Sequence, residues 1–111
     1  MSLNAFFSIE YVGAADTGAG AIAFANGKIA GLDVGGVVYK GFYEVRDSQV
    51  VAHLELSAPH GARLVTGTPL PAGARLPLDV EIPLDRTDGH VIEVPLPSGT
   101  VKVRITKVGD L

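Results

Sequence analysis

Few side chains in this protein combine the type and the spacing that catalysis or metal binding requires. The 111 residues include three histidines, His53, His60 and His90, and no cysteine. No two histidines have the short spacing that places both on one face of a strand or helix, so a zinc site would need ligands that only the fold brings together. No serine stands in a nucleophile-elbow motif, so a Ser-His-Asp triad would need the same convergence. We therefore expect a non-enzyme with no catalytic residues, no metal site and no cofactor.

Two other segments could bind a small group, but turn chemistry explains both. Gly18 and Gly20 form a Gly-x-Gly, yet a strand rather than a helix follows, and no Gly-Lys-Ser or Gly-Lys-Thr is present. Asp33 comes after a predicted strand and before Gly35-Gly36. A short acid in that position usually accepts hydrogen bonds from turn amides. We expect a structural role for these residues.

Composition and charge exclude several classes of protein. Hydrophobic residues make up 47% of the chain and charged residues 19%, which indicates a folded domain rather than disorder. The net charge is −3 and no two basic residues are adjacent, which argues against direct nucleic-acid binding. No apolar run reaches the roughly 18–20 residues of a membrane helix, and no basic-then-apolar signal peptide is present. We expect one domain over residues 1–111, cytoplasmic and without membrane contact.

The clearest structural signal is a β-hairpin centred on Asn26-Gly27. Both residues tolerate the positive φ that a type I′ turn demands, and short apolar runs flank them. A two-residue loop places Phe24 opposite Ile29 on one face and Ala25 opposite Lys28 on the other. The hairpin therefore has an apolar face and a more polar one, as the wall of a barrel or sandwich requires.

Most of the remaining chain also predicts strands, because apolar and polar residues alternate with a period of two. These strands lie around Phe7–Tyr11, Gly20–Ala25, Lys28–Asp33, Val37–Val45, Gln49–Ser57 and Leu76–Leu84, with a short strand at Arg63–Thr66 inside the Gly- and Pro-rich connection from Ala58 to Ala74. A last hairpin, with Ser98-Gly99 as its loop, is expected to pair Leu96 with Val101, Val94 with Val103 and Ile92 with Ile105.

About eight strands joined mainly by hairpins predict an all-β fold. A closed or nearly closed antiparallel up-and-down barrel is favoured because closure removes exposed strand edges, and a two-sheet sandwich is the alternative. Pro77, Pro83 and Pro95 fall inside predicted strands. Proline donates no ladder hydrogen bond, so we expect these strands to be bulged, weakly paired or placed at an opening in the barrel.

The first part of the chain carries a family resemblance. Its elements are Phe7-Ser8-Ile9, Asp16-Thr17-Gly18-Ala19-Gly20, Ile22, Asn26-Gly27, Gly31, Asp33 and Val38-Tyr39-Lys40-Gly41. In this order and at these spacings, over Phe7 to Tyr43, they resemble the GrlR family of small barrel proteins, negative regulators of type III secretion. The resemblance implies an eight-stranded calycin-like barrel, a homodimer, and a regulator that sequesters a helix-turn-helix activator instead of binding DNA.

The resemblance also points to one loop as the contact with a protein partner. In the family, a run of four acidic residues after the Tyr-x-Gly strand is tied to partner binding. The matching loop here is Glu44-Val45-Arg46-Asp47-Ser48, which keeps two acids and places Arg46 between them. The candidate partner-binding residues are Glu44, Arg46, Asp47 and Ser48.

The interior of the barrel is the second candidate site. Apolar side chains from all the long strands share the inward parity. They are Phe7, Ile9, Tyr11, Ile22, Phe24, Ile29, Leu54, Leu56, Leu78, Val80, Ile82, Val94, Val103 and Ile105. An eight-stranded barrel either fills with such side chains or holds one small ligand, here a fatty-acid-like or lipid-like molecule. Among the strands only Lys40 could supply the cation that usually pairs with a fatty-acid carboxylate.

Overall fold

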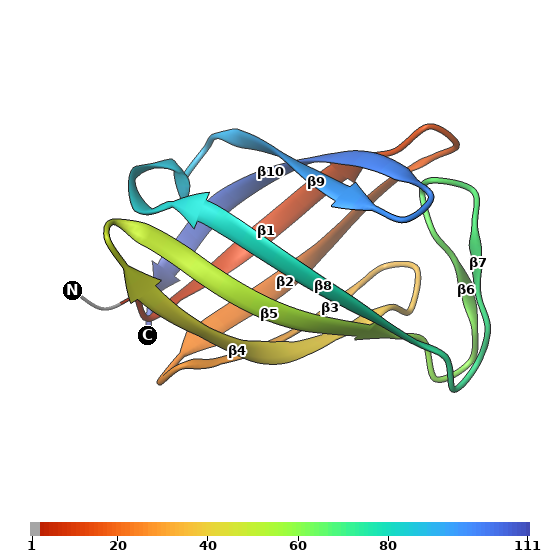
Figure 1. Cartoon of the computed structure of the whole chain (residues 1–111), viewed down its shortest axis with the longest axis horizontal. Helices are drawn as coiled ribbons and strands as arrows, with labels where there is room; N and C mark the ends of the chain where they lie inside the picture. The colour runs from red at the N-terminus through yellow and green to blue at the C-terminus, as the bar shows by residue number, and fades with distance from the viewer. Residues whose placement is uncertain (1–2) are drawn as a thin grey trace.

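The structure, a computed structural model, describes residues 3–111 and is built almost entirely of β-strands (Figure 1). The strands are β1 (Ala5–Val12), β2 (Thr17–Ala25), β3 (Lys28–Asp33), β4 (Val38–Arg46), β5 (Gln49–Ser57), β6 (Ala62–Arg63), β7 (Pro69–Leu70), β8 (Arg75–Pro83), β9 (Val91–Leu96) and β10 (Gly99–Asp110). One turn of 3-10 helix, η1 (Leu84–Arg86), follows β8.

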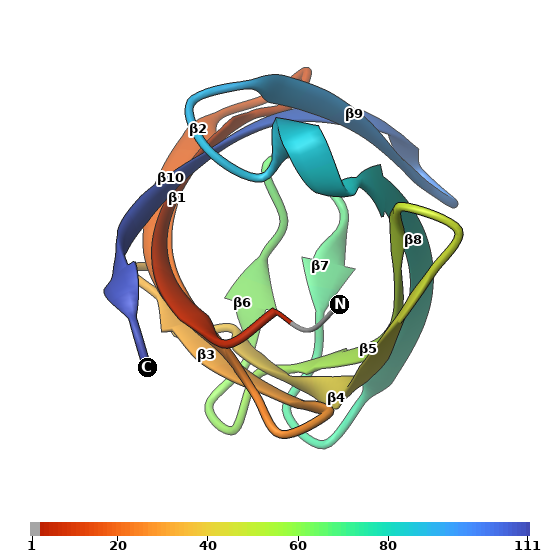
Figure 2. The same cartoon turned by 90° about the vertical axis from the view of Figure 1, so that its left-hand side faces the viewer.

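Eight of these strands form a single antiparallel sheet that curls into a nearly closed barrel. Its order is β8-β5-β4-β3-β2-β1-β10-β9, so most neighbours in the sheet are also neighbours in the chain. Viewed along its axis the sheet surrounds a central space, with β8 and β9 meeting as the two edges (Figure 2). The prediction of an all-β, eight-stranded up-and-down barrel is confirmed.

Two tight turns set the register of the N-terminal half. Asn26 and Gly27 have φ of 52° and 79°, and Phe24 pairs with Ile29, as the Asn-Gly hairpin predicts. The turn between β4 and β5 has the same character, because Asp47 and Ser48 have φ of 51° and 64°. These primed turns match the right-handed twist of the strands that they join.

The predicted register of the last hairpin is wrong by two residues. Leu96 pairs with Gly99 and Val94 with Val101, so the loop is Pro97-Ser98 and not Ser98-Gly99. Pro97 has the fixed φ that the second position of a type I turn favours, and Gly99 then takes the fourth position. A shift of two residues leaves every side chain on its predicted face, so the alternation did not reveal the error.

The prolines lie where the barrel opens. Pro77 and Pro83 belong to β8 and Pro95 belongs to β9, the two strands at the edges of the sheet. An edge strand tolerates proline because one side of its backbone has no ladder partner. Of the three expected situations, bulged, weakly paired or at an opening, the structure shows the last for these strands.

A small hairpin closes one end of the barrel. The expected short strand at Arg63–Thr66 is only partly present, because β6 ends at Arg63 and pairs with β7 across the turn 64–68. Both strands cross the far opening of the barrel in Figure 2. The carbonyl of Val65 accepts hydrogen bonds from the amides of Ala15 (2.8 Å) and Asp16 (3.1 Å), which tie this cap hairpin (residues 62–70) to the β1–β2 loop.

The opposite end of the barrel is filled by aromatic side chains. The ring of Phe24 meets those of Phe7 and Tyr43 edge to face, with centroids 5.6 Å and 5.0 Å apart. The Tyr43 hydroxyl donates to the carbonyl of Leu3, which fastens the N-terminal segment across this end. Because these rings fill the bore, we call this region the packed end.

Candidate functional site

An apolar cavity of about 310 Å³ occupies the barrel interior toward the cap hairpin. Its walls run from Ile22 and Phe24 to Leu64 and Val65 of the cap hairpin. The volume lies at the lower end of the range for small-molecule pockets.

Most of the side chains predicted to face inward lie on the wall of this cavity. They are Ile9, Tyr11, Ile22, Phe24, Leu54, Leu56, Leu78, Val80, Ile82, Val94, Val103 and Ile105. Phe7 and Ile29 are instead buried in the core of the packed end. The inner face of the barrel is thus filled at one end and hollow at the other.

One corner of the cavity is polar and centres on Asp33. This residue ends β3 and is only 5% exposed, the one buried charged residue within the described chain. Its Oδ1 accepts hydrogen bonds from the amides of Gly35 (2.9 Å) and Val37 (3.0 Å), which confirms the expected turn role. Its Oδ2 accepts hydrogen bonds from the hydroxyls of Tyr39 (2.6 Å) and Tyr11. Four donors therefore surround one carboxylate.

A glycine allows Tyr11 to reach Asp33 across the sheet. Tyr11 lies on β1 and Asp33 on β3, two strands apart and so about 10 Å from backbone to backbone. Gly18 on the intervening β2 pairs with Tyr11, and a Cβ at Gly18 would overlap Cζ of the tyrosine ring. The ring therefore lies directly over the bare glycine backbone, which brings its hydroxyl to the carboxylate.

Both tyrosines remain protonated over the physiological pH range. Burial, reinforced by the hydrogen bond to Asp33, raises the pKa of Tyr39 and of Tyr11 above the usual tyrosine value. Each hydroxyl proton points at Asp33, so the oxygens present only lone pairs to any other group.

The polar corner was only partly visible in the sequence. The sequence predicts hydrogen bonds from turn amides to Asp33, and it predicts no polar role for Tyr39. The signal that could have found it is the alternation of side chains between the two faces of each strand. This alternation places Tyr11, Asp33 and Tyr39 on the inward face at one end of the sheet. Gly18 and Gly20 lie between them on the same face. Small residues beside inward polar ones indicate that the polar side chains converge.

The cation at this site also comes from an unexpected segment. Lys40, the one strand cation considered for the interior, is exposed on the outer face. Arg63 of the cap hairpin lines the cavity instead, with an exposed side chain that donates to the carbonyl of Gly67 at 3.3 Å. The alternation along the barrel strands could not predict this position, because Arg63 lies in the connection between β5 and β8 and not in the barrel wall.

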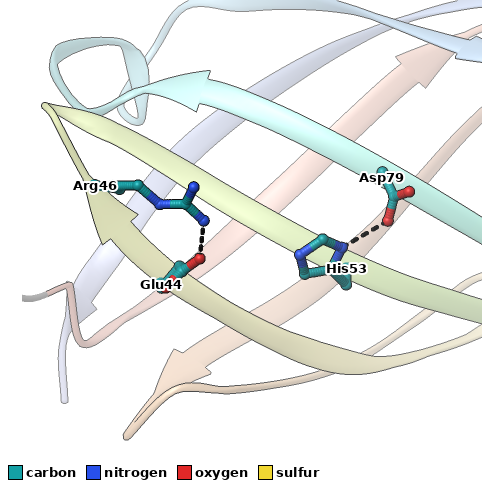
Figure 3. Close-up of polar contacts among 4 residues, drawn as sticks. All are labelled: Glu44, Arg46, His53 and Asp79. Carbon is teal, nitrogen blue, oxygen red and sulfur yellow. Dashed lines mark hydrogen bonds and ion pairs between the residues drawn. The ribbon is translucent and has the colours of Figure 1, made fainter.

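The histidines lie away from the cavity. His53 is on the outer face of β5, where its Nδ1 lies 2.7 Å from Oδ1 of Asp79 on β8 (Figure 3). His60 and His90 are exposed in loops. Within residues 3–111, no three His, Asp or Glu side chains are placed to hold a metal ion.

The loop proposed as a protein contact lies at the packed end, far from the polar corner. Glu44, Arg46, Asp47 and Ser48 are all exposed, and Arg46 forms an ion pair with Glu44 (Figure 3). The backbone carbonyl of Ser48 accepts a hydrogen bond of 2.9 Å from the amide of Leu84, which links the loop to η1. The ion pair cancels one of the two acidic charges of the loop.

No protein-family model matches this chain, and no curated protein matches its sequence significantly. Across the described residues, no helix has the length and apolar character needed to cross a membrane.

Proposed function

We propose that the barrel binds one small, largely apolar molecule in its interior. The observation that carries this proposal is the apolar cavity of about 310 Å³ with a single polar corner. Binding pockets commonly combine an apolar wall with a few polar groups that orient the ligand. An apolar ligand in such a cavity removes apolar surface of its own and of the wall from water.

Filling the cavity tests this proposal directly. Val80 on β8 lines the cavity, and Glu81, the next residue, is exposed on the outer face. Val80→Trp should weaken the binding of N-phenylnaphthylamine, a neutral apolar dye, by about tenfold or more, because the indole occupies the space of the ligand. Glu81→Trp adds the same bulk outside the barrel and should leave the affinity unchanged.

Fluorescence titration gives the dye affinity, and circular dichroism reports whether each variant keeps its strands. The natural chain contains no tryptophan. The emission of the introduced indole therefore reports its own environment, buried at position 80 and solvated at position 81. Equal dye binding by both folded variants would place the binding site outside the barrel.

A second proposal is that the protein regulates a protein partner in the cytoplasm, as the GrlR-like residues imply. It is supported by the exposure of Glu44 and Arg46 at the end of β4 and of Asp47 and Ser48 in the turn that follows. Charge reversal in the double variant Glu44→Lys and Asp47→Lys should abolish capture of a helix-turn-helix activator without changing the melting temperature. Capture by the variant equal to that by the wild type would remove this loop from the proposal, and native mass spectrometry tests the implied homodimer.

A further inference from the structure

The hydrogen bonds at the polar corner determine which chemical groups it can still accept. An ionised carboxylate is an acceptor only, with about four lone-pair sites on its two oxygens. Asp33 receives two amide donors on Oδ1 and two tyrosine hydroxyls on Oδ2. The carboxylate is thus fully occupied by the protein, and no donor of this cluster is left over for a ligand.

The tyrosines define what a ligand meets in the cavity. A phenol has one proton and two lone pairs, and Tyr11 and Tyr39 each direct the proton at Asp33. Both side chains line the cavity. The corner therefore offers acceptors to the interior, and a ligand that completes it must bring the donor.

The charged side chains on the cavity wall, Asp16, Asp33 and Arg63, sum to one negative charge, which also disfavours an anionic head group. The buried carboxylate of Asp33 and the exposed carboxylate of Asp16 both line the cavity. A carboxylate on the ligand would meet lone pairs and like charge in a largely apolar space, where repulsion is screened less than in water. Arg63, which also lines the cavity, is an exposed side chain of the cap hairpin bonded to the Gly67 carbonyl.

We propose that the cavity binds an amphiphile whose head group donates a hydrogen bond, a hydroxyl or an ammonium, to the oxygens of Tyr11 and Tyr39. This inference rests on the proposed interior binding function and adds the chemistry of the head group. The apolar chain then extends toward Ile22 and Phe24, and the head group lies beneath the cap hairpin.

Three ligands with one chain length test the proposal: n-decanol, n-decylamine and n-decanoate at neutral pH, each measured by calorimetry and by displacement of N-phenylnaphthylamine. We expect n-decanol, n-decylamine or both to bind at least about tenfold more tightly than n-decanoate. Tighter n-decanol identifies a neutral hydroxyl as the preferred head, and tighter n-decylamine identifies an ammonium.

Removing one tyrosine oxygen provides the test on the protein side. Tyr39→Phe removes one phenol oxygen and frees one lone pair of Asp33, so it should change the preference for a donor head several-fold. Tyr43→Phe is the matched control, because Tyr43 belongs to the packed end and bonds Leu3. It should leave the preference unchanged. Tyr11→Phe takes the place of Tyr39→Phe if the latter does not fold, and the comparison of the three ligands on the wild type needs no variant.

The outcomes separate this inference from the function on which it rests. Absence of binding by all three ligands and by the dye would overturn interior binding itself. Decanoate binding as tight as that of the donors, with loss in Arg63→Gln, would keep the function and overturn the head-group inference in favour of an anion held by Arg63. Equal affinities for the three ligands, in the wild type and in Tyr39→Phe alike, would also overturn the head-group inference.

Discussion

The two ends of this barrel are built from the same strands but filled in different ways. At the packed end the inward positions hold Phe7, Phe24 and Tyr43, whose rings meet in the bore. Toward the cap hairpin, the inward positions of β2 and β3 include Gly18 and Gly31. The ring of Tyr11 covers the backbone of Gly18, and the rest of this end is lined mainly by aliphatic side chains such as Val94 and Val101, which leave the cavity between them. The difference shows that the size of the inward residues, and not the topology, decides whether such a barrel is solid or hollow.

Truncating one inward side chain at each end should give the largest difference in the free energy of unfolding between the two ends. Phe7→Ala should lower the free energy of unfolding by about 3–5 kcal/mol, because it opens a cavity in a close-packed core. Phe7 is 1% exposed. Leu54→Ala should cost only about 1–2 kcal/mol, because Leu54 already borders a cavity and mainly its transfer free energy is lost. Urea unfolding measures both, and equal losses would show that the cap end is as tightly packed as the other.

A substitution beneath Tyr11 should have an intermediate effect. In Gly18→Ala the new methyl group would overlap the tyrosine ring, so the ring must move and its hydrogen bond to Asp33 is lost. We expect a cost of about 1–3 kcal/mol from overpacking and from the weakened carboxylate network. Thermal and urea unfolding measure it.

Gly109→Ala is the control for this substitution. A Cβ at Gly109 would meet nothing within 4 Å, and the residue has no positive φ. Its effect should therefore stay within about 0.5 kcal/mol. If both variants behave alike, Tyr11 does not depend on the glycine for its position.

The smallest expected effect is the dependence of stability on alkaline pH, which comes from Tyr11 and Tyr39 at the hollow end. Folding raises the pKa of Tyr11 and Tyr39, so the folded protein retains protons that the unfolded chain releases above the usual tyrosine pKa of about 10. The unfolded state then binds fewer protons, and the free energy of unfolding must fall as the pH rises through that range, by at most about 1.4 kcal/mol per pH unit for each tyrosine.

Tyr39→Phe should flatten this dependence, because one of the two groups no longer titrates. Urea unfolding about one pH unit below and one above the usual tyrosine pKa of about 10 gives the slope for the wild type and the variant. Below that pKa, the free energy of unfolding includes the full contribution of the hydrogen bonds from the tyrosines to Asp33. It decreases only above that pKa. Identical slopes would mean that Tyr39 is not held protonated by the fold.

Local patterns predicted most of the fold because local chemistry governs it. Asn26-Gly27 determines a turn, and the turn determines the register of its two strands. Prolines in β8 and β9 predicted strands that are bulged, weakly paired or at an opening, and the structure places both strands at the edges of the sheet. The register of β9 and β10 failed because two adjacent turns, Pro97-Ser98 and Ser98-Gly99, satisfy the same alternation.

The candidate site was less predictable, because its parts come from segments far apart in the chain. Alternation predicted which side chains face inward, but it does not report how much of the bore they fill. The convergence of Tyr11 and Tyr39 on Asp33 requires three strands in register and a bare glycine between two of them. Arg63 reaches the cavity only because the connection folds back as a cap.

By itself, the sequence determined the strands, most of the turns and the inward face, since each follows from residues adjacent in the chain or from the period of two. Only the tertiary structure decided that one end is packed and the other hollow, that four donors occupy Asp33, and that an arginine from the cap lines the cavity. The physical reason is that volume and hydrogen-bond saturation are sums over side chains brought together from distant strands, and no local pattern contains those sums.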